Sequence, residues 1–235
     1  MKIKGKVFTA QQVQSMIAGN MNMFREVIKP QPIGEFIENE SWSRSIAASC
    51  GVRNPANSDI EEHAKKCSNI FSFRRENGLI VGKLAPYRVG QKIFCKEKFS
   101  VIKNIDFNYP PHDWRRDGQY IYEADAARSV GMYGCVKWKP AQHMKQEHSR
   151  LTLLIKEIRV ERLASISVVD ARDEGCPLEE ALYKKEDFDN VKLHHSEINP
   201  FLKNFIKNWN ATHKKPEEKF EANPFVWVCT MEVVK

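Results

Sequence analysis

The sequence contains no long hydrophobic run, since no apolar stretch approaches the roughly 18 residues that a membrane-spanning helix needs. Its first residues, MKIKGKVFTAQQV, lack the apolar core of a signal peptide. A Gly-rich phosphate loop, a GxSxG elbow and an HExxH motif are also missing, which excludes the common nucleotide-hydrolase, serine-hydrolase and zincin signatures. We therefore expect a cytoplasmic protein that has no membrane partner.

Closely spaced cysteines are absent as well. The six cysteines are far apart and form no CxxC pair, which argues against a zinc ribbon and against a thioredoxin-like redox motif. His63 and Cys67 could share one face of a helix as metal ligands, but no second ligand pair is evident. We expect buried, reduced thiols, with Cys229 in an apolar strand as the clearest case, and neither a metal nor a cofactor.

The composition is that of a globular protein. With 235 residues, 42% of them hydrophobic, the chain can bury a substantial core and is not globally disordered. We expect one domain over residues 1–235, with an insertion at about 33–82, where the polarity is mixed. The net charge of +7 favours a polyanionic partner, although simple solubility explains the charge equally well.

Three helices begin with capping residues. Thr9 and Gln12 fit a capping box ahead of an apolar stripe, and Ser167 with Asp170 begins a second helix. Asn199 is followed by a proline, which suits the start of a third helix. The apolar residues of this third helix recur every four positions, which predicts that it packs on the core: Phe201, Phe205 and Trp209.

The strand predictions point to a curved sheet. In the strand over 151–163, Leu151, Leu153 and Ile155 share one parity, whereas Ile158 and Val160 share the other. Such a slip of the apolar phase indicates a β-bulge or the corner of a closed sheet, which favours a small barrel over a flat sandwich. Residues 87–102 and the ending NPFVWVCTMEVV also have strand patterns, and residues 20–32 suit a strand or tight loop with outward cations.

A basic loop precedes the phase-slipped strand. Trp138 stands between Lys137 and Lys139, and His143 and Arg150 follow. An aromatic ring beside cations suits a stacked base next to a phosphate, and each stacking contact contributes about 1–3 kcal/mol in single-strand binders. Residues 137–162 contain seven cations and three anions, an excess of four within the net +7. The alternative is that Trp138 plugs one end of the barrel and that the lysines are merely solvated.

Glu174 is the candidate acid–base group. It ends the helix that Ser167 begins and precedes Gly175. A carboxylate there could act as a general base or accept a hydrogen bond from the amino group of a base. A glutamate at the end of a helix is more often simply exposed.

Four blocks of the chain, in order, resemble bacteriophage and prophage proteins with an ASCH-like domain, of the PUA-like barrel superfamily. The blocks are MIAGNMNMFREVIKPQP, PYRVGQKIFCKEKF, KWKPAQHMKQEHSRLTL and ISVVDARDEG, and NPFVWV fits the family's ending. The resemblance implies an α+β fold, a small PUA-like β-barrel with flanking short helices and an insertion, and a cleft for RNA or a modified nucleobase. Some relatives are amidohydrolases that act on acetylated cytidine.

In those enzymes a Lys and a Thr of the first block act with a Glu of the last helix. The Glu matches Glu174, whereas Met21 stands at the Lys position and Phe24 at the Thr position. The first Thr of the block is replaced by Asn22. Because neither Met nor Phe can supply a nucleophile or a proton, the resemblance argues against that hydrolysis in this chain.

The leading hypothesis is a module without enzymatic activity that binds RNA or a nucleotide-like ligand in a basic cleft. A nucleic-acid hydrolase or nucleoside amidohydrolase that uses Glu174 is the alternative, and a phage structural or host-interaction protein is a third possibility. The protein partner, if any, is unknown, and a phage origin would place the protein in the bacterial host cytoplasm. The cleft residues that we expect are Arg25, Lys29, Lys137, Trp138, Lys139, His143, Arg150 and Glu174.

Overall fold

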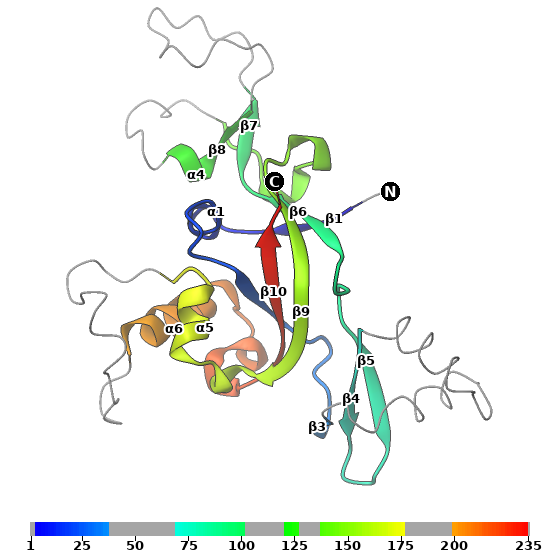
Figure 1. Cartoon of the computed structure of the whole chain (residues 1–235). Coiled ribbons are helices and arrows are strands. Elements are labelled where there is room, and N and C mark those ends of the chain that lie inside the picture. Colours follow the sequence, from blue (N-terminus) through cyan, green and yellow to red (C-terminus); the bar gives the residue numbers. More distant parts are fainter. Residues whose placement is uncertain (1–2, 38–68, 102–119, 127–136, 177–198, 235) are drawn as a thin grey trace, which may run out of the picture.

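The computed structural model describes residues 3–37, 69–101, 120–126, 137–176 and 199–234. These residues form a mixed α+β structure in which one five-stranded sheet is the centre and helices cover one of its faces (Figure 1). Two smaller sheets lie at opposite ends of it (Figure 1). The mixed α+β class expected from the sequence is confirmed.

The central sheet has the strand order β1-β6-β9-β10-β2. Its strands are β1 (Lys4–Val7), β6 (Lys92–Lys96), β9 (Thr152–Arg162), β10 (Phe225–Val233) and β2 (Met23–Val27). β1 runs parallel to β6, and the other three pairings are antiparallel. The apolar C-terminal segment is therefore an inner strand, which is why five consecutive residues at its start are buried.

The phase slip in the strand over 151–163 is confirmed as an irregularity of the ladder. Thr230 of β10 lies opposite Glu157, but the next residue, Met231, lies opposite Ile155, so Lys156 is the extra residue of a bulge. The bulge explains why Leu153 and Ile155 are buried on one side of it and Val160 on the other although their parities differ. It also bends the long β9 (Figure 1).

The sheet is open in the described part of the chain, because its edge strands β1 and β2 share no ladder. The two edges nevertheless meet through side chains. Lys6 Nζ lies 2.9 Å from Glu26 Oε2, and the rings of Phe8 and Phe24 pack edge to face with centroids 5.7 Å apart. The larger apolar core fills the concave side, where Ile93 and Leu153 are fully buried.

Helices cover the other face. α5 (Val168–Asp173) and α6 (Pro200–Thr212) pack there on a second apolar core (Figure 1). The predicted start residues Ser167 and Asn199 are their N-caps, and Phe201, Phe205 and Trp209 are buried as expected. Near the concave side, α1 (Ala10–Ile17) begins with the predicted capping box and contacts the short α4 (Glu123–Ala126).

Each of the two smaller sheets is formed by strands that follow one another in the sequence. β3 (Glu35–Ile37), β4 (Ile70–Arg74) and β5 (Ile80–Leu84) form an antiparallel meander within the segment expected to be an insertion, and residues 38–68 of that segment lie outside the described residues. β7 (Phe99–Val101) pairs with β8 (Tyr120–Tyr122) at the other end of the central sheet. In the part of the chain that is described, no helix is long and apolar enough to cross a membrane.

Candidate functional site

Two carboxylates of α5 face the sheet. The Ser167 hydroxyl accepts a hydrogen bond from the Asp170 amide and so fixes the start of this short helix. Asp170 and Glu174 are four residues apart, one helical turn, so their side chains lie on the same face. Gly175 follows with a φ of 74°, which a helix-ending glycine adopts without strain.

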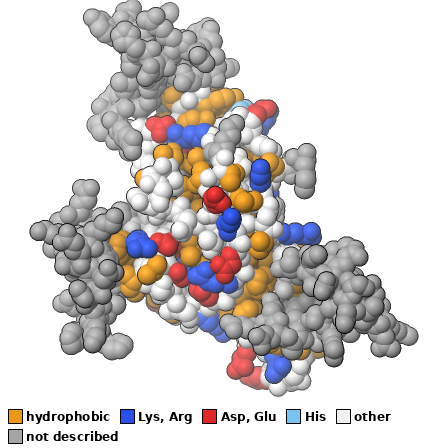
Figure 2. Space-filling model, viewed as in Figure 1, with side chains coloured by type: hydrophobic (Ala, Val, Ile, Leu, Met, Phe, Trp, Pro, Cys, Tyr) orange, Lys and Arg blue, Asp and Glu red, His pale blue; other side chains and the backbone are white. Residues whose placement is uncertain are grey.

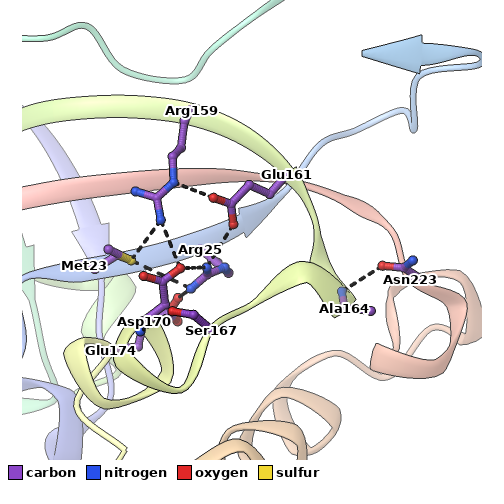
Figure 3. A network of polar contacts seen from close by, with 9 residues as sticks. All are labelled: Met23, Arg25, Arg159, Glu161, Ala164, Ser167, Asp170, Glu174 and Asn223. Atoms are coloured by element: carbon purple, nitrogen blue, oxygen red, sulfur yellow. Dashed lines mark hydrogen bonds and ion pairs between the residues drawn. The ribbon is translucent and has the colours of Figure 1, made fainter. Parts of the chain in front are cut away.

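Two arginines of the sheet meet these carboxylates. Val228 of β10 lies opposite Arg25 of β2 on one side and opposite Arg159 of β9 on the other, so the three residues form one row across the sheet. Both arginines project toward α5 (Figure 3). The expectation that Arg25 points outward is wrong, because its side chain is 0% exposed: Asp170, Glu161 and Glu174 accept hydrogen bonds from its two terminal nitrogens, while Nε is buried without a partner among the described residues.

We call Arg25, Arg159, Glu161, Asp170 and Glu174 the charge cluster (Figure 3). Arg25 donates from Nη1 to Glu174 Oε1, and from Nη2 to Asp170 Oδ2 at 2.7 Å and Glu161 Oε2 at 3.1 Å. Arg159 donates to the same Asp170 oxygen at 3.0 Å and to Glu161. Both guanidinium groups are therefore bound by carboxylates from two different elements, which ties α5 to the sheet.

Burial sets the protonation of the cluster. It raises the pKa of Glu174 to about 7, because the ionised form loses its hydration, while the positive charge of Arg25 opposes this shift. Burial acts to lower the pKa of Arg25, but Glu174 and Asp170 outweigh it and raise that pKa. Arg25 thus stays cationic, and Glu174 titrates near neutral pH.

Arg25 and Glu174 are the buried members of the charge cluster, whereas the side chains of Asp170, Glu161 and Arg159 are 18%, 23% and 29% exposed. Glu174 is 8% exposed, and its backbone bridges to Met21, which is 2% exposed. Met21 therefore lies next to Glu174 as an apolar core residue. Phe24 is also 2% exposed. A ligand would have to displace Arg25 before it could reach the Glu174 carboxylate.

The loop Lys137–Pro140, which we call the basic loop, lies at the end of the central sheet that carries β7. The Lys139 amide donates to the Phe99 carbonyl at 2.8 Å, and the Ser100 hydroxyl donates to the Lys137 carbonyl at 3.0 Å. Lys137 and Lys139 are exposed, and Trp138 between them is half-buried. Among the described residues, neither lysine has a carboxylate partner, and the Lys139 ammonium lies 5.9 Å from the centre of the Phe99 ring.

Arg150 lies close to this end of the sheet but is neutralised. Its Nε and Nη2 donate to the two oxygens of Glu97 at 2.9 and 3.0 Å, and its Nη1 donates to Asp125. Glu97 is 1% exposed, and its burial raises its pKa while Arg150 opposes the shift. Arg150 therefore neutralises the buried carboxylate of Glu97, as Arg25 neutralises that of Glu174.

The remaining expected residues lie apart. Lys29 follows β2 and binds Glu218 Oε1 at 2.7 Å, whereas His143 is exposed in a short 3₁₀ turn after the basic loop. Arg25 lies in one row of the sheet with Arg159, and Arg159 comes nine residues after Arg150. Nine extended residues span roughly 30 Å, so Arg25 and Arg150 lie toward different ends of the sheet. The expected residues thus do not converge on one cleft through their contacts. On the face shown in Figure 2, Lys and Arg are interspersed with Asp and Glu over the described surface.

Sequence reasoning missed the partners of the arginines. Glu97 carried a usable signal, because it shares its parity with Ile93 and Cys95, both of which are buried. Asp170 and Glu174 carried another, since their spacing places both on one helix face. Glu161 carried none, because a charged residue at the end of a strand has no pattern that marks it as a partner of Arg25.

No group of metal-ligating side chains occurs in the described ranges. Cys95, Cys176 and Cys229 are buried free thiols, so the expectation for Cys229 is confirmed. His63 and Cys67 lie outside the described residues. Comparison of the chain with family models, curated proteins and solved structures finds no match, so the family resemblance rests on the sequence blocks alone.

Proposed function

We propose that this chain is an ASCH-type, PUA-like module that binds single-stranded RNA through the basic loop. The observation that carries this proposal is the pair of exposed lysines, Lys137 and Lys139, which have no carboxylate partner in the described part of the chain and flank Trp138. Because hydrogen bonds to β7 already hold their backbones, binding costs little backbone conformational entropy. Phosphates would contact the lysines, and a base would stack on Trp138.

The curvature of the sheet supports the barrel that the resemblance implies. Its two edge strands are joined by the Lys6–Glu26 ion pair and the Phe8–Phe24 contact, and a bulge bends β9. A sheet that curls until its edges touch through side chains needs only a further ladder to become a closed barrel. The fold we propose is therefore a PUA-like barrel with one seam between β1 and β2.

The alternative, a hydrolase that uses Glu174, has less support. A general base must reach the proton that it removes. Glu174 is covered and bound by Arg25, and its neighbours Met21 and Phe24 are apolar and buried. We therefore assign Glu174 to the stability of the fold.

The test is fluorescence anisotropy with a 12-nucleotide single-stranded RNA, titrated at several salt concentrations. Replacing both Lys137 and Lys139 by Gln should weaken binding and reduce the slope of log affinity against log salt by about 1.4, because each phosphate contact on a single strand contributes about 0.7. The matched control is Lys203→Gln with Lys207→Gln, which removes two exposed lysines from α6. An equal loss in both double variants would contradict a specific role of the basic loop.

A further inference from the structure

A cleft opens at the free edge of β2, and no residue of the charge cluster or of the basic loop lines it. Its volume is about 320 Å³. This is near the lower end of the roughly 300–1,000 Å³ found for small-molecule sites. The cleft therefore has room for one base or nucleoside but not for a folded nucleic acid. Its lining residues are Glu26, Val27, Lys29, Leu84, Pro86, His213 and Trp227.

Glu26 presents a fixed acceptor at this cleft. Its Oε2 accepts hydrogen bonds from Lys6 Nζ at 2.9 Å and from the Tyr87 hydroxyl at 3.4 Å. Its Oε1 has no partner among the described residues. The side chain is 39% exposed, so the carboxylate is held in place on one side and open on the other.

The backbone of Val27 adds a donor and an acceptor. The Ile28 amide donates to the Phe225 carbonyl, so the peptide groups of Ile28 and Glu26 face β10. In an antiparallel pair, consecutive residues face opposite directions, which turns the N–H and C=O of Val27 toward the free edge. In the described chain no strand covers this edge, and Val27 lines the cleft.

Two further groups complete the lining. His213 stacks on Trp209, with ring centroids 3.9 Å apart, and its Nδ1 lies 3.1 Å from the Trp209 carbonyl oxygen. A carbonyl only accepts, so Nδ1 carries the proton and the neutral ring keeps Nε2 as an acceptor. At the rim, Lys29 is 61% exposed and binds Glu218, which leaves ammonium protons for a second anion.

We propose that this cleft binds the guanine base of a nucleotide, with Lys29 contacting the phosphate. A guanine edge presents one carbonyl acceptor beside two N–H donors. The cleft offers the complement: the Val27 N–H as donor, and the Val27 carbonyl and Glu26 Oε1 as acceptors. Adenine, cytosine and uracil would each place a donor opposite a donor, or an acceptor opposite an acceptor, at one or more of these groups. The site does not depend on the basic loop, so RNA binding through Lys137 and Lys139 and guanine binding can succeed or fail separately.

The test is calorimetric titration of the full chain with the four ribonucleoside 5′-monophosphates and with guanosine. We expect guanosine monophosphate to bind at least about tenfold more tightly than the other three, the discrimination that one well-placed pair of base contacts provides. Lys29→Gln should bring its affinity down to that of guanosine. Glu26→Gln should remove the preference for guanine, whereas the control Lys203→Gln should leave all affinities unchanged.

A second variant guards against misfolding of the Glu26 variant, because Glu26 also binds Lys6. Leu84 is 65% exposed, so Leu84→Trp fills the cleft without disturbing the core, and circular dichroism checks the fold. This variant should lose binding of all the nucleotides. Equal affinities for the four monophosphates, no binding at millimolar concentration, or full binding by Leu84→Trp would each overturn the proposal.

Discussion

Arg25 and the two lysines of the basic loop carry the same charge but have opposite environments. Arg25 is fully covered, and three carboxylates bind it. Lys137 and Lys139 are exposed, and no carboxylate of the described residues binds them. The difference shows that a local excess of cations does not by itself mark a binding surface: what matters is whether the fold has already supplied the counter-charges.

Arg150 sharpens the comparison because it lies near the basic loop but resembles Arg25. It binds both oxygens of the buried Glu97 and also contacts Asp125. Its guanidinium also lies 4.3 Å from the centre of the Tyr122 ring. Proximity along the chain therefore does not make Arg150 part of the same surface as the lysines.

The largest effect should come from removing Arg25. Arg25→Met leaves the buried carboxylate of Glu174 without its arginine and removes one of the two arginines that bind the partly exposed Asp170, which should lower the free energy of unfolding by about 3–5 kcal/mol. Urea denaturation measures this change. Arg172→Met is the control, because Arg172 lies in the same part of the fold but is 56% exposed. A loss for Arg25→Met as small as that of the control would remove the distinction between buried and exposed cations.

The next effect is a pH dependence of stability that comes from the charge cluster. The folded-state pKa of Glu174 is about 7. In the unfolded chain it is about 4.3. The folded state therefore binds this proton more tightly, so stability is highest below the unfolded value and is lost as the pH rises through 7. The full loss is on the order of 4 kcal/mol.

Denaturation of the wild type and of Glu174→Gln from pH 5 to pH 8 checks this prediction. The variant has no carboxyl group at position 174. The fall in stability that Glu174 causes in the wild type over this pH range should therefore be absent from the variant. His213 titrates in both proteins and cancels in the difference. Parallel curves would show that Glu174 does not carry the effect.

The smallest expected effect on stability is that of the basic loop. Replacing Lys137 and Lys139 by Gln should change the free energy of unfolding by less than about 0.5 kcal/mol, because exposed side chains without partners contribute little. The same denaturation experiment measures it. A loss comparable to that of Arg25→Met would mean that these lysines support the fold instead of a ligand.

Local features of the fold were predictable because short-range rules determine them. The cap residues Thr9, Ser167 and Asn199 begin helices as expected, since each side chain bonds an amide only two or three residues away. The bulge in β9 was visible as a change of apolar parity. The strands β3 to β5 were not recognised, because their pattern is weak: in β5, exposed and half-buried residues alternate and none is buried.

The candidate site was predictable only in part. Arg25 and Glu174 were among the cleft residues expected from the sequence, and the structure brings them into direct contact. The sequence did not reveal that Glu161 and Asp170 also bind Arg25, nor that Lys29, just after β2, binds Glu218. These pairs join residues far apart in the sequence, and no local pattern encodes their distance.

The sequence alone determined the elements of this protein: its capped helices, its apolar strands, the bulge and the basic loop, because each depends on residues a few positions apart. Only the tertiary structure decided which of the cations are buried and paired with carboxylates and which are exposed. The strand order β9-β10-β2 brings Arg159 and Arg25 beneath α5, where carboxylates bind both, while the exposed end of the sheet leaves Lys137 and Lys139 to solvent. The physical reason is that burial and pairing depend on contacts across the sheet, which the order of residues along the chain does not specify.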